Sequence, residues 1–196
     1  MSAVFSDLIL KGRTSLANPA YADSRDWFRY KASLVGAISP NRVIAGNADN
    51  QRNNVLPGYM YLFNYDAKTK DQLPYWDRFP LIFPFKMEAD SFLGINLHYL
   101  PPLYRAKLMD ALYDLVSNKN FDEKTKLRLS YDMLNASARY KYFEPCIKRY
   151  LKSHVKSRFL LIPSNEWDIA LFLPLERFTT GSNLVYQESI NKLRRM

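Results

Sequence analysis

The sequence predicts an α+β protein in which a small antiparallel β unit, of SH3-like or open-barrel form, is packed by C-terminal helices. Residues 57–100 contain short runs that are dense in strand-forming residues and are separated by polar or Pro-Gly turns. Residues 101–176 instead repeat their apolar residues at helical spacing. A hydrophobic fraction of 47% and a charged fraction of 24% are ordinary for a globular chain.

Three strands are expected in the β unit. They cover residues 59–65, 79–85 and 92–99. Pro80 and Pro84 keep the second run away from a central position unless they lie at its ends or at a bulge. Gly94, inside the third run, indicates a bulge or a close approach of two backbones. Because three short strands are marginal alone, a partner strand or helical cover is needed.

The second half of the chain supplies that cover. Pro101-Pro102 opens a helix with a continuous apolar face, and Asp122 is the expected N-cap of a second helix. A third helix is expected over 144–157. A short fourth strand at 158–162 and a last helix over 164–172 follow.

The expected organisation has three parts. Residues 1–56 form a helical segment followed by an extended N-terminal arm, which is polar and rich in Asn over residues 39–55. Residues 57–178 form the α+β core domain, and residues 179–196 form a basic C-terminal tail. A surface loop is the alternative interpretation of the arm.

Several classes of protein are disfavoured. No run of about 18 apolar residues is present, so neither a transmembrane helix nor a membrane partner is expected. The N-terminus lacks the apolar core of a secretory signal. Two histidines and one cysteine do not make a conventional zinc site, and no metal or cofactor is expected.

No catalytic set is readable, so the chain is not expected to be an enzyme. His98 and His154 are each interpreted as hydrogen-bonded structural residues rather than general bases. Cys146 is expected to be buried as a small hydrophobe, and no Gly-rich phosphate loop is present. Turn-forming and solubilising roles, rather than metal binding, are expected for Asp66, Asp71 and Asp77.

Positive charge is concentrated late in the chain. Residues 139–158 hold seven basic residues and one acid, a net +6 within a total of +9. On the expected third helix the cations share one face, which could lie along a phosphate backbone. A solvated helix face is the alternative. The candidate nucleic-acid-binding residues are Lys148, Arg149, Lys152, Lys156, Arg158, Arg139 and Lys141.

Four stretches carry a resemblance to a known family. They are 57–61 (PGYMY), 73–81 (LPYWDRFPL), 92–101 (FLGINLHYLP) and 167–178 (WDIALFLPLERF). Together they resemble a virion protein of large contractile-tailed bacteriophages, of the DNA end protector type. The resemblance implies a non-enzymatic protein on the end of the packaged genome near the portal and neck. It implies a location in the virion, and in the host cytoplasm during assembly.

The partners expected on these grounds are double-stranded DNA and other virion subunits. The alternative is a neck, tail or baseplate assembly protein that acts through protein–protein contacts alone. In that case the arm and the aromatic-rich surface would dock on neighbouring subunits, and the basic face would meet an acidic one.

Overall fold

The computed structural model describes residues 39–100, 118–138, 141–164 and 175–194, with single positions at 105, 108, 112 and 167. The helices are α3 (Pro40–Gly46), α5 (Glu123–Ser137) and α7 (Ser182–Arg194), with 3₁₀ turns η1 (Ala48–Asn50), η2 (Leu97–Tyr99), η3 (Lys141–Cys146) and η4 (Lys152–His154). The strands are β1 (Gln51–Arg52), β2 (Met60–Leu62), β3 (Leu81–Met87), β4 (Ser91–Asn96), β5 (Ile147–Leu151) and β6 (Phe159–Ile162).

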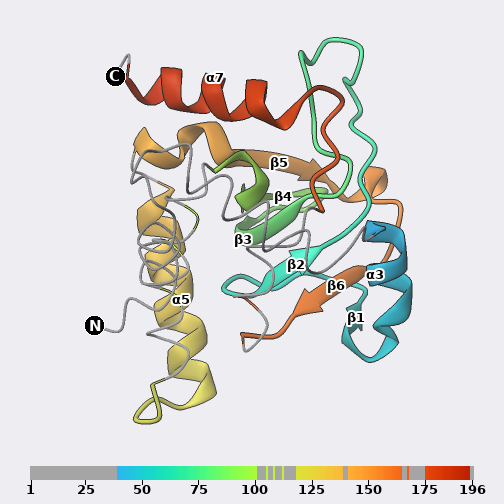
Figure 1. Cartoon of the computed structure of the whole chain (residues 1–196). Coiled ribbons are helices and arrows are strands. Elements are labelled where there is room, and N and C mark those ends of the chain that lie inside the picture. Colours follow the sequence, from blue (N-terminus) through green and yellow to red (C-terminus); the bar gives the residue numbers. More distant parts are fainter. Residues whose placement is uncertain are drawn as a thin grey trace, which may run out of the picture.

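These strands form one open antiparallel sheet of six strands in the order β1-β6-β2-β3-β4-β5 (Figure 1). This confirms the α+β class. The expected strands within 57–100 and at 158–162 are present as β2, β3, β4 and β6. The sheet nevertheless extends beyond the expected β unit, because β5 and β6 come from the second half of the chain and β1 comes from the segment before residue 56.

The prediction of a helix over 144–157 is wrong. This segment instead forms the end of η3, then β5 and η4. The physical reason is the free edge of β4, whose backbone groups pair with Ile147–Leu151 in an antiparallel ladder. Tyr150, paired with Phe92, is buried by that arrangement. Tertiary pairing therefore overrides the helical periodicity of the apolar residues.

Two other expectations about local structure also need correction. Part of the expected extended arm is ordered as α3, η1 and β1, because Ile44 packs into the core and Gln51 and Arg52 pair with β6. The segment expected as a basic C-terminal tail contains α7, whose Val185 is fully buried. Helices expected in residues 1–38, and most of those expected over 101–117 and 164–172, lie outside the described residues.

The second helix of the prediction is confirmed as α5. The Asp122 carboxylate accepts a hydrogen bond of 2.7 Å from the backbone N–H of Thr125, which satisfies one of the free donors at the helix start. Leu134 on this helix is fully buried in the core. α5 thereby covers part of one face of the sheet next to β3.

The prolines and the glycine of the β3–β4 pair lie where the sequence predicted. Pro80 immediately precedes β3, and the register of the pair shifts between Pro84 and Lys86. Gly94 faces Pro84 across this irregularity. A Cβ atom at Gly94 would lie 3.1 Å from Ile82 Cδ1 and 3.2 Å from the carbonyl oxygen of Phe83. The close approach of the two backbones therefore favours glycine here, because a larger residue would push its neighbours aside.

We expect Gly94→Ala to lower the free energy of unfolding by about 1–3 kcal/mol, because a backbone carbonyl cannot move aside as a side chain can. Urea denaturation followed by circular dichroism measures the change. Gly46→Ala is the matched control, since no atom lies within 4 Å of its added Cβ. Equal free energies of unfolding for the two variants would show that β3 and β4 accommodate the added Cβ atom without loss of stability.

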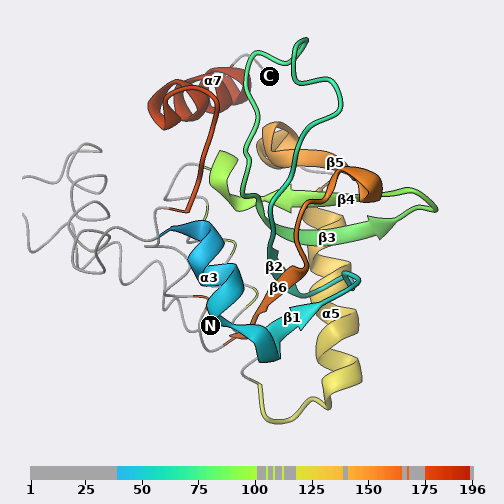
Figure 2. The ribbon, with the colours of Figure 1, turned by 90° about the vertical axis from the view of Figure 1, so that its right-hand side faces the viewer.

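The two faces of the sheet are covered differently. One face packs against the helices and holds a core that includes Phe83, Leu112, Leu134 and Trp167. The opposite face carries a separate, largely aromatic cluster covered by connections between strands. α7 lies beside η2 and η3, and the β2–β3 connection extends past the sheet towards the start of α7 (Figures 1 and 2).

Candidate nucleic-acid interface

The aromatic cluster on the second face is centred on Phe63. Its ring makes edge-to-face contacts with four neighbouring rings, at centroid distances of 5.0 to 6.2 Å. The neighbours are Tyr65, Phe92, Tyr150 and Phe159. This packing fixes the connections that cross the face, namely residues 53–58, 63–80 and 152–158. We call this side of the sheet the loop-covered face.

A pocket of about 360 Å³ opens between the β2–β3 connection and β5, which we call the aromatic pocket. This volume falls in the range of about 300–1,000 Å³ typical of small-ligand sites. Aromatic rings from both elements line it, and exposed Lys68 and Arg149 are also among its lining residues. The aromatic lining residues are Tyr65, Tyr75, Trp76, Tyr99 and Tyr150.

Lys148 is the inward-facing cation of this pocket. Its Nζ atom lies 4.2 Å from the centroid of the Tyr99 ring, a cation–π contact. Burial lowers the pKa of the Lys148 ammonium, and the nearby charge of Lys192 on α7 lowers it further. No described carboxylate forms an ion pair with Lys148. A partly buried cation without a counter-ion favours an incoming anion.

The other two cations of β5 and η4 are held at the β3–β4 turn. Arg149 is exposed and forms an ion pair of 2.8 Å with the Glu88 carboxylate. The Lys152 ammonium donates hydrogen bonds of 2.8 and 2.9 Å to the backbone carbonyls of Glu88 and Ala89. Exposed contacts of this kind are weak, so both cations remain available to an external anion.

Lys156 and Arg158 lie further along the β5–β6 connection, and both side chains are exposed. Arg158 Nε donates to the Asn53 Oδ1 atom at 3.1 Å, and its terminal nitrogens have no hydrogen-bond partner among the described residues. Lys156 has no side-chain partner among the described residues. Arg139, and the side chain of Lys141, lie outside what the structure describes.

The predicted cations therefore do not share one helical face. Lys148 and Arg149 are neighbours on a strand and point to opposite faces of the sheet. Three others follow on the β5–β6 connection, which we call the basic connection: Lys152, Lys156 and Arg158. Whether these residues bind nucleic acid stays a prediction.

A second hollow, of about 490 Å³, lies beside the basic connection. It is lined by the amide-bearing Asn53 and Asn54 and by Lys152 and Ser157. Leu56 and Met87, two of the exposed large hydrophobic residues of the described chain, also line it. The loop-covered face therefore carries this hollow as well as the aromatic pocket.

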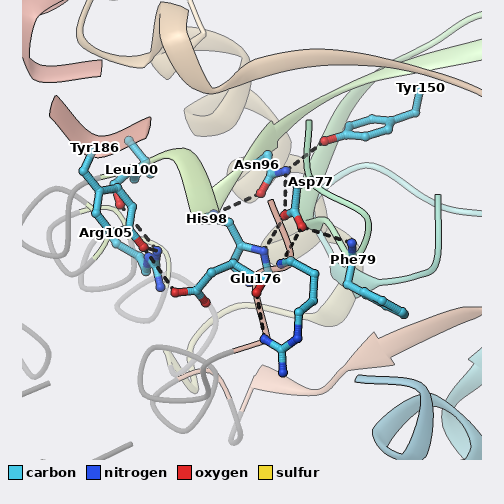
Figure 3. Close-up of polar contacts among 10 residues, drawn as sticks. Asp77, Phe79, Asn96, His98, Leu100, Arg105, Tyr150, Glu176 and Tyr186 are labelled. Carbon is cyan, nitrogen blue, oxygen red and sulfur yellow. Dashed lines mark hydrogen bonds and ion pairs between the residues drawn. The ribbon is translucent and has the colours of Figure 1, made fainter. Parts of the chain in front are cut away.

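Asp77, one of the lining residues of the pocket, is the centre of a buried polar network (Figure 3). One carboxylate oxygen accepts from His98 Nδ1 at 2.6 Å and from Asn96 Nδ2 at 3.3 Å. The other accepts from the backbone N–H groups of Phe79 and Arg177, at 3.0 and 3.1 Å. The Asn96 amide also donates to the Tyr150 hydroxyl at 3.0 Å, which joins the network to β5.

Asp77 was expected to form a turn and to favour solubility, and this is wrong because its side chain is buried as the acceptor of four hydrogen bonds. Both histidines are hydrogen bonded, as expected. His98 is fully buried against Asp77, and the His154 ring lies 2.9 Å from the carbonyl oxygen of Asp66. Cys146 is buried as expected, and burial raises the pKa of its thiol to about 12.

Sequence reasoning missed the aromatic pocket and the proximity of Lys192 to Lys148. Tyr75 and Trp76 belong to one of the stretches that carry the family resemblance, which does not indicate the surface that they line. Within the described residues, no group of three or more potential ligands could hold a metal ion. No helix there has the length and apolar character needed to cross a membrane.

The chain carries a net charge of +9, and its loop-covered face combines exposed cations with an aromatic pocket, a combination typical of polyanion-binding proteins. The family model described as "Phage T4 terminal DNA protecting protein" matches residues 24–191. Because this match spans most of the chain, the protein belongs to that family of bacteriophage proteins. No curated protein and no solved structure matches the chain.

Proposed function

We propose that this protein binds the ends of packaged double-stranded phage DNA through its loop-covered face and shields them by occupancy rather than by catalysis. The observation that carries the proposal is the family match over residues 24–191. In this proposal the protein lies in the virion at the genome end, near the neck, and contacts other virion subunits. Before assembly it is present in the host cytoplasm.

The charge distribution supports this function. The sequence carries a net charge of +9 and a pI near 9.5. The basic connection has three exposed cations, and its backbone is hydrogen bonded to the β2–β3 connection, which forms one wall of the aromatic pocket. Lysine and arginine gain affinity for duplex DNA by releasing condensed counterions from the phosphates. Such contacts hold and orient the protein but carry no sequence information.

The proposal contains no catalytic step. The His98–Asp77 pair, which is the described arrangement closest to a general base with its orienting acid, is completely shielded from solvent. Its carboxylate is committed to four hydrogen bonds that hold the fold together. A buried pair of this kind supports a structural role, because a general base needs hydrogen-bond reach to its substrate.

A comparison of two DNA forms with equal sequence tests the function. We expect the full chain to protect a linear duplex from an exonuclease, and a covalently closed circle of the same sequence to compete poorly for the protein. Binding is measured by competition at fixed, moderate salt, since electrostatic affinity depends steeply on salt. Equal competition by the circle would contradict end binding, and failure to retain either DNA would contradict DNA binding altogether.

A further inference from the structure

Backbone charge alone cannot distinguish the end of a duplex from its interior, because phosphates repeat along the whole molecule. Recognition of an end requires contact with something that the interior does not offer. A terminal nucleotide is such a feature, since its base leaves the stack at a smaller cost than an internal base does. A protein that binds ends therefore gains from a pocket that accepts an unpaired base.

The aromatic pocket has the chemistry for such a base. Bases stack on aromatic side chains regardless of sequence, because every base has a π-face. Tyr75 and Trp76 both line the pocket and are only partly buried, so they keep surface available for a ligand. Trp76 is held in place by an edge-to-face contact with Tyr65 and by hydrogen bonds between its backbone and Thr179.

The pocket also has a place for the phosphate that accompanies the base. Lys148 is positioned over the Tyr99 ring without a described carboxylate partner, and the charge of Lys192 is close enough to affect it. Lys68 adds an exposed cation to the lining. Asp77 is the one acid among the lining residues, and its oxygens are already hydrogen bonded inside the protein.

We propose that the aromatic pocket binds the unpaired base of the terminal nucleotide of a DNA strand, with Trp76 and Tyr75 as the stacking walls and Lys148 contacting the phosphate. This inference rests on the proposed function and deepens it, because it names the part of the DNA that marks an end. A nucleotide fits this pocket better than an acidic peptide does. Its phosphate would contact Lys148 and its base would stack on the aromatic rings, whereas a peptide carboxylate would contact only the lysine.

The test compares two linear duplexes of equal length and equal phosphate number, one closed by terminal G·C pairs and one carrying a terminal mismatch. The wild-type chain is expected to bind the mismatched end about tenfold more tightly, because less unpairing is needed before the base enters the pocket. In Trp76→Ala this preference is expected to disappear, while the slope of affinity against salt stays unchanged. Tyr131→Ala, on α5 and outside the pocket, is the matched control and keeps the preference.

A second measurement covers the case in which Trp76→Ala does not fold. A terminal 5-iodouracil is irradiated in the complex with the wild-type chain, and the cross-linked residues are identified by mass spectrometry. We expect cross-links to Tyr75 or Trp76, and none when the same base is placed in the duplex interior. Lys148→Gln, which leaves the aromatic walls intact, is expected to reduce the yield at the end several-fold.

The outcomes separate the inference from the function on which it rests. End-selective binding with no preference for the mismatch, or with cross-links that map elsewhere, overturns the pocket and leaves end binding intact. Loss of selectivity for linear over circular DNA overturns both. A preference for the mismatch that persists in a folded Trp76→Ala chain assigns the base to another surface and also overturns the inference.

Discussion

Replacing Asp77 by alanine is expected to lower the free energy of unfolding by about 3–5 kcal/mol, because it leaves several buried hydrogen-bond donors without an acceptor and each costs about 1–3 kcal/mol. The substitution deletes the acceptor of four hydrogen bonds at once. It leaves His98 Nδ1 and the Asn96 amide without this partner in a region that excludes solvent. Because small proteins are stable by only about 5–15 kcal/mol, the loss is a large fraction of the total.

Urea denaturation followed by circular dichroism measures this effect. Asp71→Ala is the matched control, since it removes an exposed carboxylate from the same β2–β3 connection and is expected to change stability by less than about 0.5 kcal/mol. Equal unfolding midpoints for the two variants would show that the buried network does not stabilise the fold.

The same carboxylate makes stability depend on pH. Burial by itself raises the pKa of Asp77, but the attraction and hydrogen bond of His98, with two backbone N–H groups, hold it below its usual value. A group whose pKa is lower in the folded state stabilises the protein above the unfolded value of about 3.9. That contribution is lost as the pH falls through the folded pKa. We expect the loss of stability towards acid to be smaller in Asp77→Asn.

Local signals in the sequence were sufficient for much of this fold. The N-cap at Asp122, the positions of Pro80 and Pro84 and the close approach at Gly94 were predicted because each depends on the covalent geometry of one residue. β2, β3, β4 and β6 followed from runs of strand-forming residues. The α+β class was therefore accessible without knowledge of any contact distant in sequence.

What could not be predicted depends on pairing between distant segments. Residues 147–151 match a helical pattern, and their strand conformation is decided by the free edge of β4, some fifty residues earlier in the chain. The sequence around Asp77 does not indicate that its carboxylate is buried, because its partners His98 and Arg177 come from two other segments. The aromatic pocket is hidden for the same reason, since its walls come from two elements that are remote in sequence.

The prediction of an exposed basic segment holds although the predicted helix was wrong, because the charge of a segment depends on its composition and not on its secondary structure. The basic segment was assigned to the wrong element, yet Lys152, Lys156 and Arg158 are still exposed on one connection. The arrangement of the cations differs from the prediction. In place of a row on one helix, Lys148 lines the aromatic pocket, Arg149 is paired with Glu88, and the other three lie on the basic connection. In our proposal the basic connection supplies the general electrostatic contribution, and the pocket around Lys148 recognises the DNA end.

Neutralising the basic connection is expected to have the largest effect on function. The triple variant Lys152→Gln, Lys156→Gln and Arg158→Gln lowers the net charge from +9 to +6. If each side chain neutralises one phosphate, the slope of log affinity against log salt falls by about 0.9 per contact, or about 2.7 in total. At moderate salt the affinity for linear duplex is expected to fall about a hundredfold.

The matched control removes three exposed cations from the region around α5: Lys119→Gln, Lys124→Gln and Arg128→Gln. Its net charge is also +6, so any effect of overall charge is the same in both chains. Filter binding over a salt series is expected to leave the control slope near the wild-type value while the first variant loses slope. Equal losses would mean that DNA senses only the total charge, and a loss confined to the control would move the interface to the helical face. Neither variant alters the aromatic walls, so the tenfold preference for a mismatched end is expected to persist in both.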